Sequence, residues 1–183
     1  MTAPTKVRVS EADYLARMTG EKPSLEYVNG EVIQKPMRKR DHNDIGKVLV
    51  REFFPYERQT GGYFAWEATT DLSRDDDRRY RVPDHGYWAA GKPISRPDDI
   101  YLPPTLAIEV RSQGQSLREL REKCREYREH GIDAAWLIDP QRRVVEVFDG
   151  ALDGVPIVPD GALESRLLPG FRLQLSELWT ALD

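Results

Sequence analysis

The chain has 183 residues, of which 39% are hydrophobic and 32% are charged, and its formal net charge is −4. This length suits one folded domain over residues 1–183, and four Trp and eight Tyr residues indicate a packed core rather than a disordered chain. The charge excludes a global basic field of the kind that dominates non-specific nucleic-acid binding, although local basic clusters leave a nucleic-acid function open.

The single cysteine, Cys124, excludes an internal disulfide and a cysteine-rich zinc site, and it favours a reducing compartment. The N-terminal residues lack the charged and apolar regions of a signal peptide, and no run approaches the roughly 18 to 20 apolar residues of a membrane helix. We therefore expect a cytosolic protein that does not bind membranes, in which only residues 1–9 are flexible.

The first elements of the chain are predicted to be a short helix and a hairpin. Ser10-Glu11-Ala12-Asp13 has the pattern of a capping box, and Gly20 follows the end of the helix that it opens. Residues 25–28 and 31–34 are β-like and flank Asn29-Gly30, the strongest two-residue hairpin signal.

A longer helix is predicted between Asp41 and Phe54, where apolar residues recur at helical spacing and Pro55 ends the pattern. His42 falls in its first turn, where the helix terminus favours a neutral imidazole, and a surface or capping role is the commoner one for such a residue. Residues 75–77 are three consecutive aspartates that lack the alternating ligands and glycine of an EF-hand loop, so they predict a solvated turn.

Two later β-like segments each carry an acidic residue. In residues 105–112 the apolar side chains alternate on one face, and Glu109 interrupts the run. Asp84 follows Pro83 directly and begins another β-like segment that runs through Trp88. A buried carboxylate is costly unless it is paired or binds a metal. Two strands could therefore direct Asp84 and Glu109 at one place.

A second well-marked helix follows these strands. Ser116 opens another capping box, and Gly131 lies where a C-terminal cap belongs, which predicts a helix of about four turns. Lys123 lies three residues after Leu120 and four before Tyr127, so it borders the apolar face of the helix. That position is unusual for a lysine that only solubilises the surface.

The C-terminal third of the chain is predicted to complete an α/β fold. Residues 134–139 and 144–148 have the pattern of two strands joined by a turn. Strand, helix and strand make a βαβ unit whose outer strands are parallel, and the hairpin adds an edge to the sheet. Residues 167–182 then supply a further strand and a closing helical turn.

The acidic residues suggest a metal site. Asp84, Glu109 and the backbone carbonyl between Val110 and Arg111 offer hard oxygen donors, which suit Mg²⁺ or Mn²⁺. Such an ion lowers the pKa of bound water and stabilises charge on a phosphoryl oxygen. Lys123 is favoured over Arg111 for activating the water, because only lysine can lose a proton near neutral pH, and Arg111 would hold a phosphate or a carboxylate. Alternatively, Glu109 and Arg111 form salt bridges in an ordinary α/β protein.

A set of motifs in a fixed order also carries a family resemblance. The motifs are Leu25-Glu26-Tyr27-Val28-Asn29-Gly30-Glu31-Val32, His42 in the following helix, Val82-Pro83-Asp84, Ile108-Glu109-Val110-Arg111-Ser112, Lys123 with Tyr127 and Gly131, and Trp136-Leu137-Ile138-Asp139-Pro140. As a set they resemble the PD-(D/E)XK nuclease superfamily, and specifically the Uma-two family of "putative restriction endonucleases". The resemblance extends from about Ser10 to Asp183.

The resemblance implies a restriction-endonuclease-like α/β core, with a central mixed β-sheet flanked by helices and preceded by an N-terminal helix and β-hairpin. It also implies Mg²⁺-dependent hydrolysis of DNA phosphodiester bonds, and frequent homodimers. Asp84 matches the acid of the PD half-motif, Glu109 matches the acid of the E-x-K half-motif, and Glu26 matches an early glutamate of the family that would join the site.

The sequence departs from the superfamily pattern at Arg111, where lysine is expected. Either the lysine has migrated to the helix as Lys123, or the site is catalytically weak. In the second case the protein would be a nucleic-acid-binding or protein-interaction module that keeps the nuclease fold.

Overall fold

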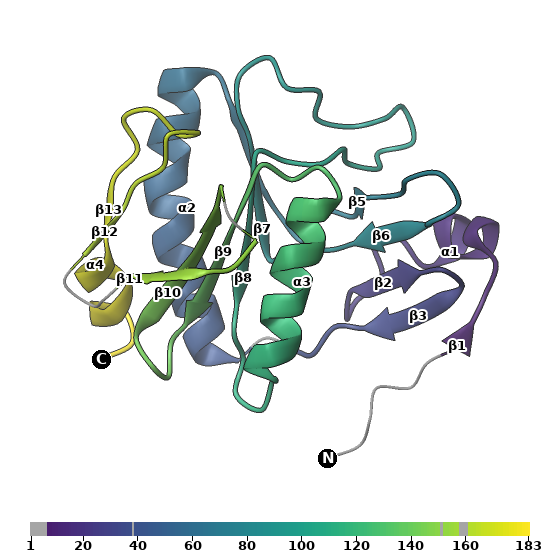
Figure 1. Ribbon diagram of the computed structural model, residues 1–183, viewed down its shortest axis with the longest axis horizontal. Coiled ribbons are helices and arrows are strands. Elements are labelled where there is room, and N and C mark those ends of the chain that lie inside the picture. The colour runs from purple at the N-terminus through teal and green to yellow at the C-terminus, as the bar shows by residue number, and fades with distance from the viewer. Residues whose placement is uncertain (1–6, 38, 151, 158–160) are drawn as a thin grey trace.

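The computed structural model describes residues 7–37, 39–150, 152–157 and 161–183, and it contains two main β-sheets (Figure 1). The larger sheet has six strands in the order β11-β10-β9-β8-β7-β4. These strands are β4 (Tyr63–Trp66), β7 (His85–Trp88), β8 (Leu106–Val110), β9 (Ala134–Asp139), β10 (Val144–Asp149) and β11 (Val155–Ile157). Neighbouring strands are antiparallel except for β8 and β9, which are parallel.

Helices cover both faces of the six-stranded sheet (Figure 1). Helices α2 (Arg40–Thr60) and α4 (Leu175–Thr180) pack on one face, and α3 (Leu117–Glu129) packs on the other. Because α3 is the crossover from β8 to β9, these two strands run in the same direction. This arrangement confirms the predicted βαβ unit and the mixed sheet flanked by helices.

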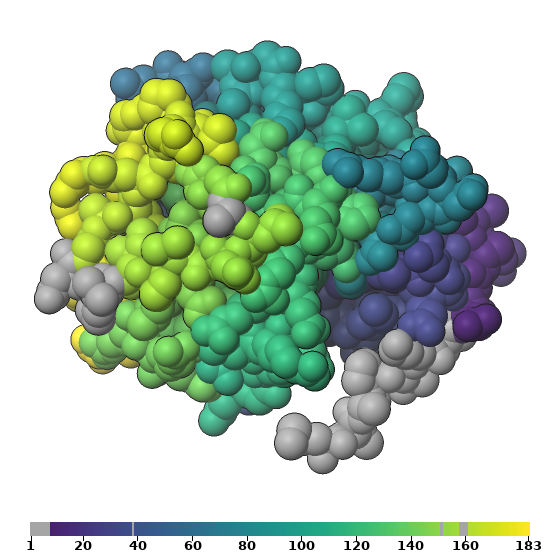
Figure 2. Space-filling view, in the orientation of Figure 1, coloured from purple at the N-terminus to yellow at the C-terminus, as the bar shows by residue number. Residues whose placement is uncertain are grey.

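A second sheet has five short strands in the order β1-β3-β2-β6-β5. These strands are β1 (Val7–Arg8), β2 (Leu25–Val28), β3 (Glu31–Gln34), β5 (Thr70–Asp71) and β6 (Arg79–Arg81). Helix α1 (Glu11–Arg17) packs Tyr14 against the rings of Tyr27 and Tyr80. This sheet lies at the opposite end of the molecule from the small sheet of β12 (Ala162–Leu163) and β13 (Leu173–Gln174) (Figures 1 and 2).

Local sequence signals act as predicted in the first helix, the hairpin and α3. The Ser10 side chain accepts a hydrogen bond from the backbone N–H of Asp13, and Ser116 caps α3 in the same way. Asn29 and Gly30 have φ angles of 48° and 90°, the left-handed values that a tight hairpin turn requires at both positions.

The predicted end of the second helix is wrong, because Pro55 lies inside α2 and does not end it. The helix continues to Thr60 and is capped by Gly61, which has a φ of 73° and donates its N–H to the carbonyl of Glu57. A proline inside a helix costs about 3 kcal/mol or more. Phe53 and Tyr56, on either side of the proline, are both buried in the core, and this packing offsets that cost.

Two further expectations are corrected at the edges of the sheets. Strand β10 is not an edge of the large sheet, because β11 pairs along its outer side. Residues 7 and 8 belong to β1, which pairs with Val32 and Glu31 of β3, and the N–H of Val9 donates to the carbonyl of Gly30, so residues 7–9 are held against the hairpin. The rest of the segment predicted to be flexible, residues 1–6, lies outside the described residues.

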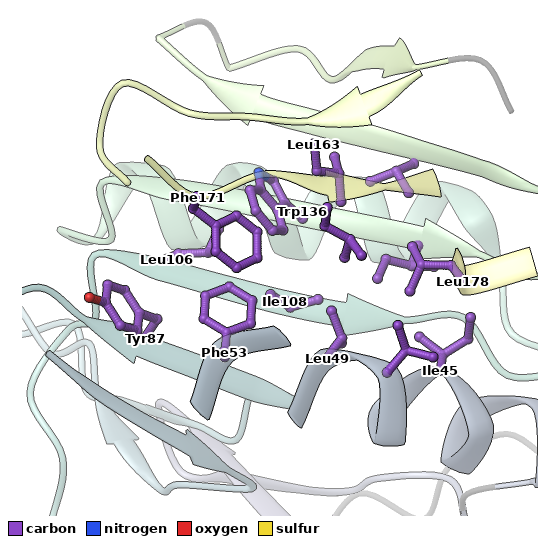
Figure 3. Close-up of a cluster of buried hydrophobic side chains, with 14 of the residues drawn as sticks. Ile45, Leu49, Phe53, Tyr87, Leu106, Ile108, Trp136, Leu163, Phe171 and Leu178 are labelled. Carbon is purple, nitrogen blue, oxygen red and sulfur yellow. The ribbon is translucent and has the colours of Figure 1, made fainter. Parts of the chain in front are cut away.

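The main core lies between α2 and the large sheet (Figure 3). Phe53 stacks on Phe64 and Phe171 with centroid distances of 4.5 and 4.4 Å. Burying such a side chain contributes about 1.5 to 3 kcal/mol. In β8, Leu106 and Ile108 pack into this core, whereas Ala107 packs under α3. The alternation predicted for this strand is confirmed, and it places Glu109 toward α3.

Candidate active site

Asp84 and Glu109 lie where β7 and β8 run side by side. His85 is paired with Ile108 in the antiparallel register of these strands, and Asp84 and Glu109 are the next residues beyond that pair. Only 3% of Asp84 and 2% of Glu109 is exposed. Both predicted acids are therefore buried at the same end of the two strands.

Lys123 joins Glu109 to a second acid, Glu26 of β2. Its Nζ atom lies 2.9 Å from Glu109 Oε1 and 2.7 Å from Glu26 Oε1. One turn along α3, the hydroxyl of Tyr127 donates a 2.5 Å hydrogen bond to Glu109 Oε1. The helical spacing that placed Lys123 at the border of the apolar face therefore directs it into the acidic site.

Glu26 is further held by residues at the end of β6. Arg81 Nη1 donates a 2.9 Å hydrogen bond to Glu26 Oε2, and the backbone N–H of Val82 donates to Glu26 Oε1 at 3.0 Å. Glu26 is 3% exposed. The five-stranded sheet thus supplies one carboxylate to a site whose other acids belong to the six-stranded sheet.

Asp84 has a separate set of partners. Lys35, one residue after β3, donates from Nζ to Asp84 Oδ1 at 2.7 Å, and the backbone N–H of Val110 donates to Oδ2 at 2.8 Å. His42 Nε2 lies 2.9 Å from the same Oδ2 atom. Lys35 also donates to the carbonyl of Val82, which connects this group to the backbone that holds Glu26.

The acids of the site are paired with the protein's own cations. Among the described residues, the buried acids Glu26, Asp84 and Glu109 contact Lys35, Arg81 and Lys123, and Arg81 is shared with Glu126. Burial alone would raise the pKa of Glu26, but Lys123, Arg81 and Lys35 outweigh burial and lower it to about 2. Asp84 is likewise buried, and Lys35 and His42 hold its pKa well below the usual range. Both acids are ionised at neutral pH.

The same field acts on Lys123. Burial alone would lower the pKa of this lysine, but the carboxylates of Glu109 and Glu26 outweigh burial and raise it above the ordinary value. Lys123 therefore keeps its proton at neutral pH in this arrangement. Its charge suits orientation of a water molecule or stabilisation of an anion, and does not suit proton abstraction.

Arg111 is directed at another partner. Its Nη1 atom lies 2.8 Å from Asp139 Oδ2, and its Nε atom donates to the carbonyl of Gln115. Asp139 is 2% exposed and also accepts hydrogen bonds from the backbone of the following turn. The structure thus brings Glu26, Glu109 and Lys123 together, joins Asp84 to them through the backbone, and places Arg111 against the end of β9.

Sequence reasoning missed two members of the site. Lys35 lies at the end of a hairpin and has no spacing signal, because its partner Asp84 is 49 residues away. The expected surface or capping role of His42 is wrong, since this residue is 4% exposed and bonded to Asp84. The helical phase that buries Ile45 and Leu49 could have indicated this, because His42 lies three and seven residues before them on the same face.

The donor set suits a divalent ion of the magnesium type. Within the described residues, no three His, Cys, Asp or Glu side chains converge as a ready-made metal site. Magnesium, however, is commonly held by only one or two carboxylates together with water and substrate phosphates. Asp84 and Glu109 supply two such carboxylates. Because Lys35 Nζ lies 2.7 Å from Asp84 Oδ1, an ion held by Asp84 would compete with this ammonium group.

The fold and this buried acid network define the chain as an α/β protein of the restriction-endonuclease-like class. A family model described as "Uma2: Putative restriction endonuclease" matches residues 12–176, which is nearly the whole chain. The chain therefore belongs to the Uma2 family, and the resemblance noted from its motifs is confirmed.

A solved structure has the same fold. It is the crystal structure of a protein from Anabaena variabilis ATCC 29413 that is described as a putative nuclease belonging to DUF820. The two chains are 22% identical and superpose with a TM-score of 0.80, over 93% of this chain and 98% of the other. No curated protein matches the chain. At this identity the structural match establishes the shared fold and leaves the chemistry to be argued from the site.

Proposed function

We propose that this protein is a divalent-metal-dependent endonuclease that hydrolyses DNA phosphodiester bonds. The observation that carries the proposal is the contact of Lys123 with both Glu26 and Glu109, next to Asp84, at one end of the central strands. Membership of a family whose description is "Putative restriction endonuclease" supports the same activity. In this proposal Lys123 of α3 takes the role of the lysine that the superfamily pattern has at the position of Arg111.

In this proposal Asp84 and Glu109, together with the carbonyl of Val110, hold the ion, with Mg²⁺ the first candidate and Mn²⁺ the second. When bound, the ion would lower the pKa of a water ligand and stabilise negative charge on the phosphoryl oxygens. The chain's own groups orient the reactants around it. Lys123, kept charged by its carboxylate neighbours, donates hydrogen bonds to the attacking water or to a phosphate oxygen.

Glu26 is proposed as a positioning residue for Lys123. It accepts a hydrogen bond from the backbone of Val82 and is paired with Arg81, so a fixed carboxylate holds the ammonium group together with Glu109. A direct contact between Arg111 and the scissile phosphate stays a prediction from the sequence. The ion pair with Asp139 supports a simpler role, in which Arg111 fixes the loop after β8.

One observation favours a second candidate function. Each of the three acids already contacts a protein cation, so none of them depends on an added ion for a partner. A catalytically degenerate member of the family, acting as a nucleic-acid-binding or interaction module, would retain such a network for stability alone. DNA binding that needs no metal and is unaltered by Glu109→Gln would support this alternative.

The decisive experiment measures the melting temperature against Mn²⁺ and Mg²⁺ concentration, for the parent and for Asp84→Asn/Glu109→Gln. An ion that binds only the folded state raises stability by about 2.7 kcal/mol at one hundred times its Kd. A rise in the parent that vanishes in the double variant, together with metal-dependent nicking of plasmid DNA, is expected. A parent that neither responds to metal nor cleaves DNA would favour the binding module.

None of the helices in the described part of the chain is both long and apolar enough to cross a membrane. The cytosolic location and the homodimer stay predictions, from composition and from the family resemblance. Sedimentation analysis of the purified protein would test the dimer directly.

A further inference from the structure

A pocket of about 320 Å³ lies beside the acidic site, between α2 and the end of the large sheet. His42, Gly46, Lys47 and Val50 line it from the helix, and Trp66 lines it from β4. His42 also contacts Asp84, so one residue that lines the pocket is bonded to the proposed catalytic acid. Its volume is at the lower end of the range for small-molecule sites.

Trp66 is the first reason to assign a ligand to this pocket. Its exposure is 53%, whereas the other three tryptophans of the chain are at most 4% exposed. Trp66 is paired with His85 in the sheet, and the N–H of the next residue, Glu67, donates to the carbonyl of Asp84. An exposed indole therefore lies one strand away from the proposed catalytic acid.

His42 is the second and independent reason. Its Nε2 atom is bonded to Asp84, but its Nδ1 atom is buried and has no hydrogen-bond partner among the residues that the structure describes. The residue is 4% exposed. A buried polar atom in a native protein is nearly always satisfied by protein, water or ligand, so the unpartnered Nδ1 marks the His42 wall of the pocket as a place for a polar ligand edge.

The charge around the pocket fits a nucleotide. Lys39 begins α2 without a side-chain cap, and the N-terminal end of a helix attracts anions. Arg40 and Lys47 are 87% and 77% exposed beside it, and both pair with Asp44. With Asp41 and Asp44 counted, residues 39–47 keep one net positive charge, which suits a phosphate backbone next to a base in the pocket.

We propose that this pocket binds an unpaired nucleobase of the DNA strand whose phosphate is presented to Asp84 and Glu109. The base stacks on Trp66 and directs a polar edge toward His42. A duplex presents only groove edges, so its base faces are not available to an indole. The proposal rests on the endonuclease function and narrows its substrate to DNA with a single-stranded or extruded base next to the cleavage site.

Binding is measured by fluorescence anisotropy with a labelled single-stranded DNA of about 12 nucleotides, in EDTA so that no cleavage occurs. Loss of one stacked base is expected to weaken binding about 5- to 150-fold in Trp66→Ala. Trp66→Phe, which keeps an aromatic face, should stay within about threefold of the parent. Phe54→Ala is the matched control, because Phe54 is a 46% exposed aromatic residue of α2 outside the pocket lining, and it should bind like the parent.

A second variant separates loss of the pocket from loss of folding. A Cβ atom at Gly46 would meet His85 at an ordinary contact distance of 3.5 Å, so a side chain fits the backbone there and extends into the pocket. Leucine is also a better helix former than glycine. Gly46→Leu should therefore melt at the same temperature as the parent or higher, while single-stranded DNA binding falls at least as far as in Trp66→Ala.

The outcomes distinguish this proposal from the endonuclease itself. Parent-like binding by both Trp66→Ala and Gly46→Leu would overturn the base pocket, even in a protein that cleaves DNA. Equal affinity for the single strand and its duplex, with equal loss in the variants, would also overturn it. If the protein bound single strands through Trp66 but never cleaved DNA, the base-binding pocket would be supported and the endonuclease function would be rejected.

Discussion

The acids of the site are held in two different ways. Glu109 and Glu26 share one cation, Lys123, which α3 delivers at a position fixed by helical spacing. Asp84 is held by Lys35 and His42, which come from a hairpin end and from another helix. We call these the Lys123 group and the Asp84 group. The two groups differ in that one cation bridges two acids in the first, whereas in the second two side chains from different elements hold a single acid.

The comparison predicts that removing the shared cation has the largest effect. Lys123→Met leaves Glu26 and Glu109 buried without their common partner, which is expected to cost about 3 to 5 kcal/mol of unfolding free energy. Urea denaturation measures the loss. The control is Lys92→Met, because Lys92 forms a more exposed pair with Asp133 and should cost about 0 to 1 kcal/mol. Equal losses in the two variants would contradict the shared-cation assignment.

Acid pH should weaken both groups. The pKa of Glu26 is lowered to about 2 in the folded protein, and that of Asp84 is also lowered, so each acid stabilises the fold above its unfolded pKa. This stability is lost as the pH falls from about 4.5 toward 2, and Glu26 accounts for about 3 kcal/mol of it. Unfolding free energies across this range should show a shallower slope for Glu26→Gln, and an unchanged slope would argue against its buried pairing.

A smaller loss is expected when the Asp84 group loses its lysine. Lys35→Met leaves His42 and the backbone N–H of Val110 on the carboxylate, so the unfolding free energy should fall by about 1 to 3 kcal/mol. Because Lys35 no longer competes at Oδ1, the variant should also bind Mn²⁺ about tenfold more tightly, which corresponds to about 1.4 kcal/mol. Thermal shifts over a Mn²⁺ titration measure the change. Weaker metal binding would instead indicate that Lys35 helps to shape the site.

The smallest effect is predicted outside both groups. Arg111→Lys restores the residue of the superfamily pattern. It replaces the two guanidinium nitrogens that reach Asp139 and the carbonyl of Gln115 by a single ammonium group. We expect a loss of about 1 kcal/mol in stability and no change in the metal-dependent thermal shift. If the shift changed as much as it does in Glu109→Gln, Arg111 would belong to the metal site after all.

Many of the helices and turns of the fold could be predicted from local sequence patterns. The capping serines, the Asn29-Gly30 turn and the apolar spacing of residues 117–127 each depend on contacts within a few residues, and the structure confirms them. The same spacing indicated that Lys123 would face the site. The end of the helix over residues 40–60 could not be predicted from local patterns, because the long-range packing of Phe53 and Tyr56 overrides the local effect of Pro55. The assignment of the whole chain to one domain stays a prediction.

The sequence by itself indicated most of the elements and pointed to Glu109, because helical and strand periodicity are local and a carboxylate within an apolar strand is visible in the pattern. Glu26 followed only from the family resemblance. Only the tertiary structure decided the partners of those acids. The contacts of Asp84 with Lys35 and of Glu109 with Lys123 cross between sheets and helices, and no local spacing encodes them. Burial then makes each contact necessary, since a buried charge without a partner would destabilise the fold.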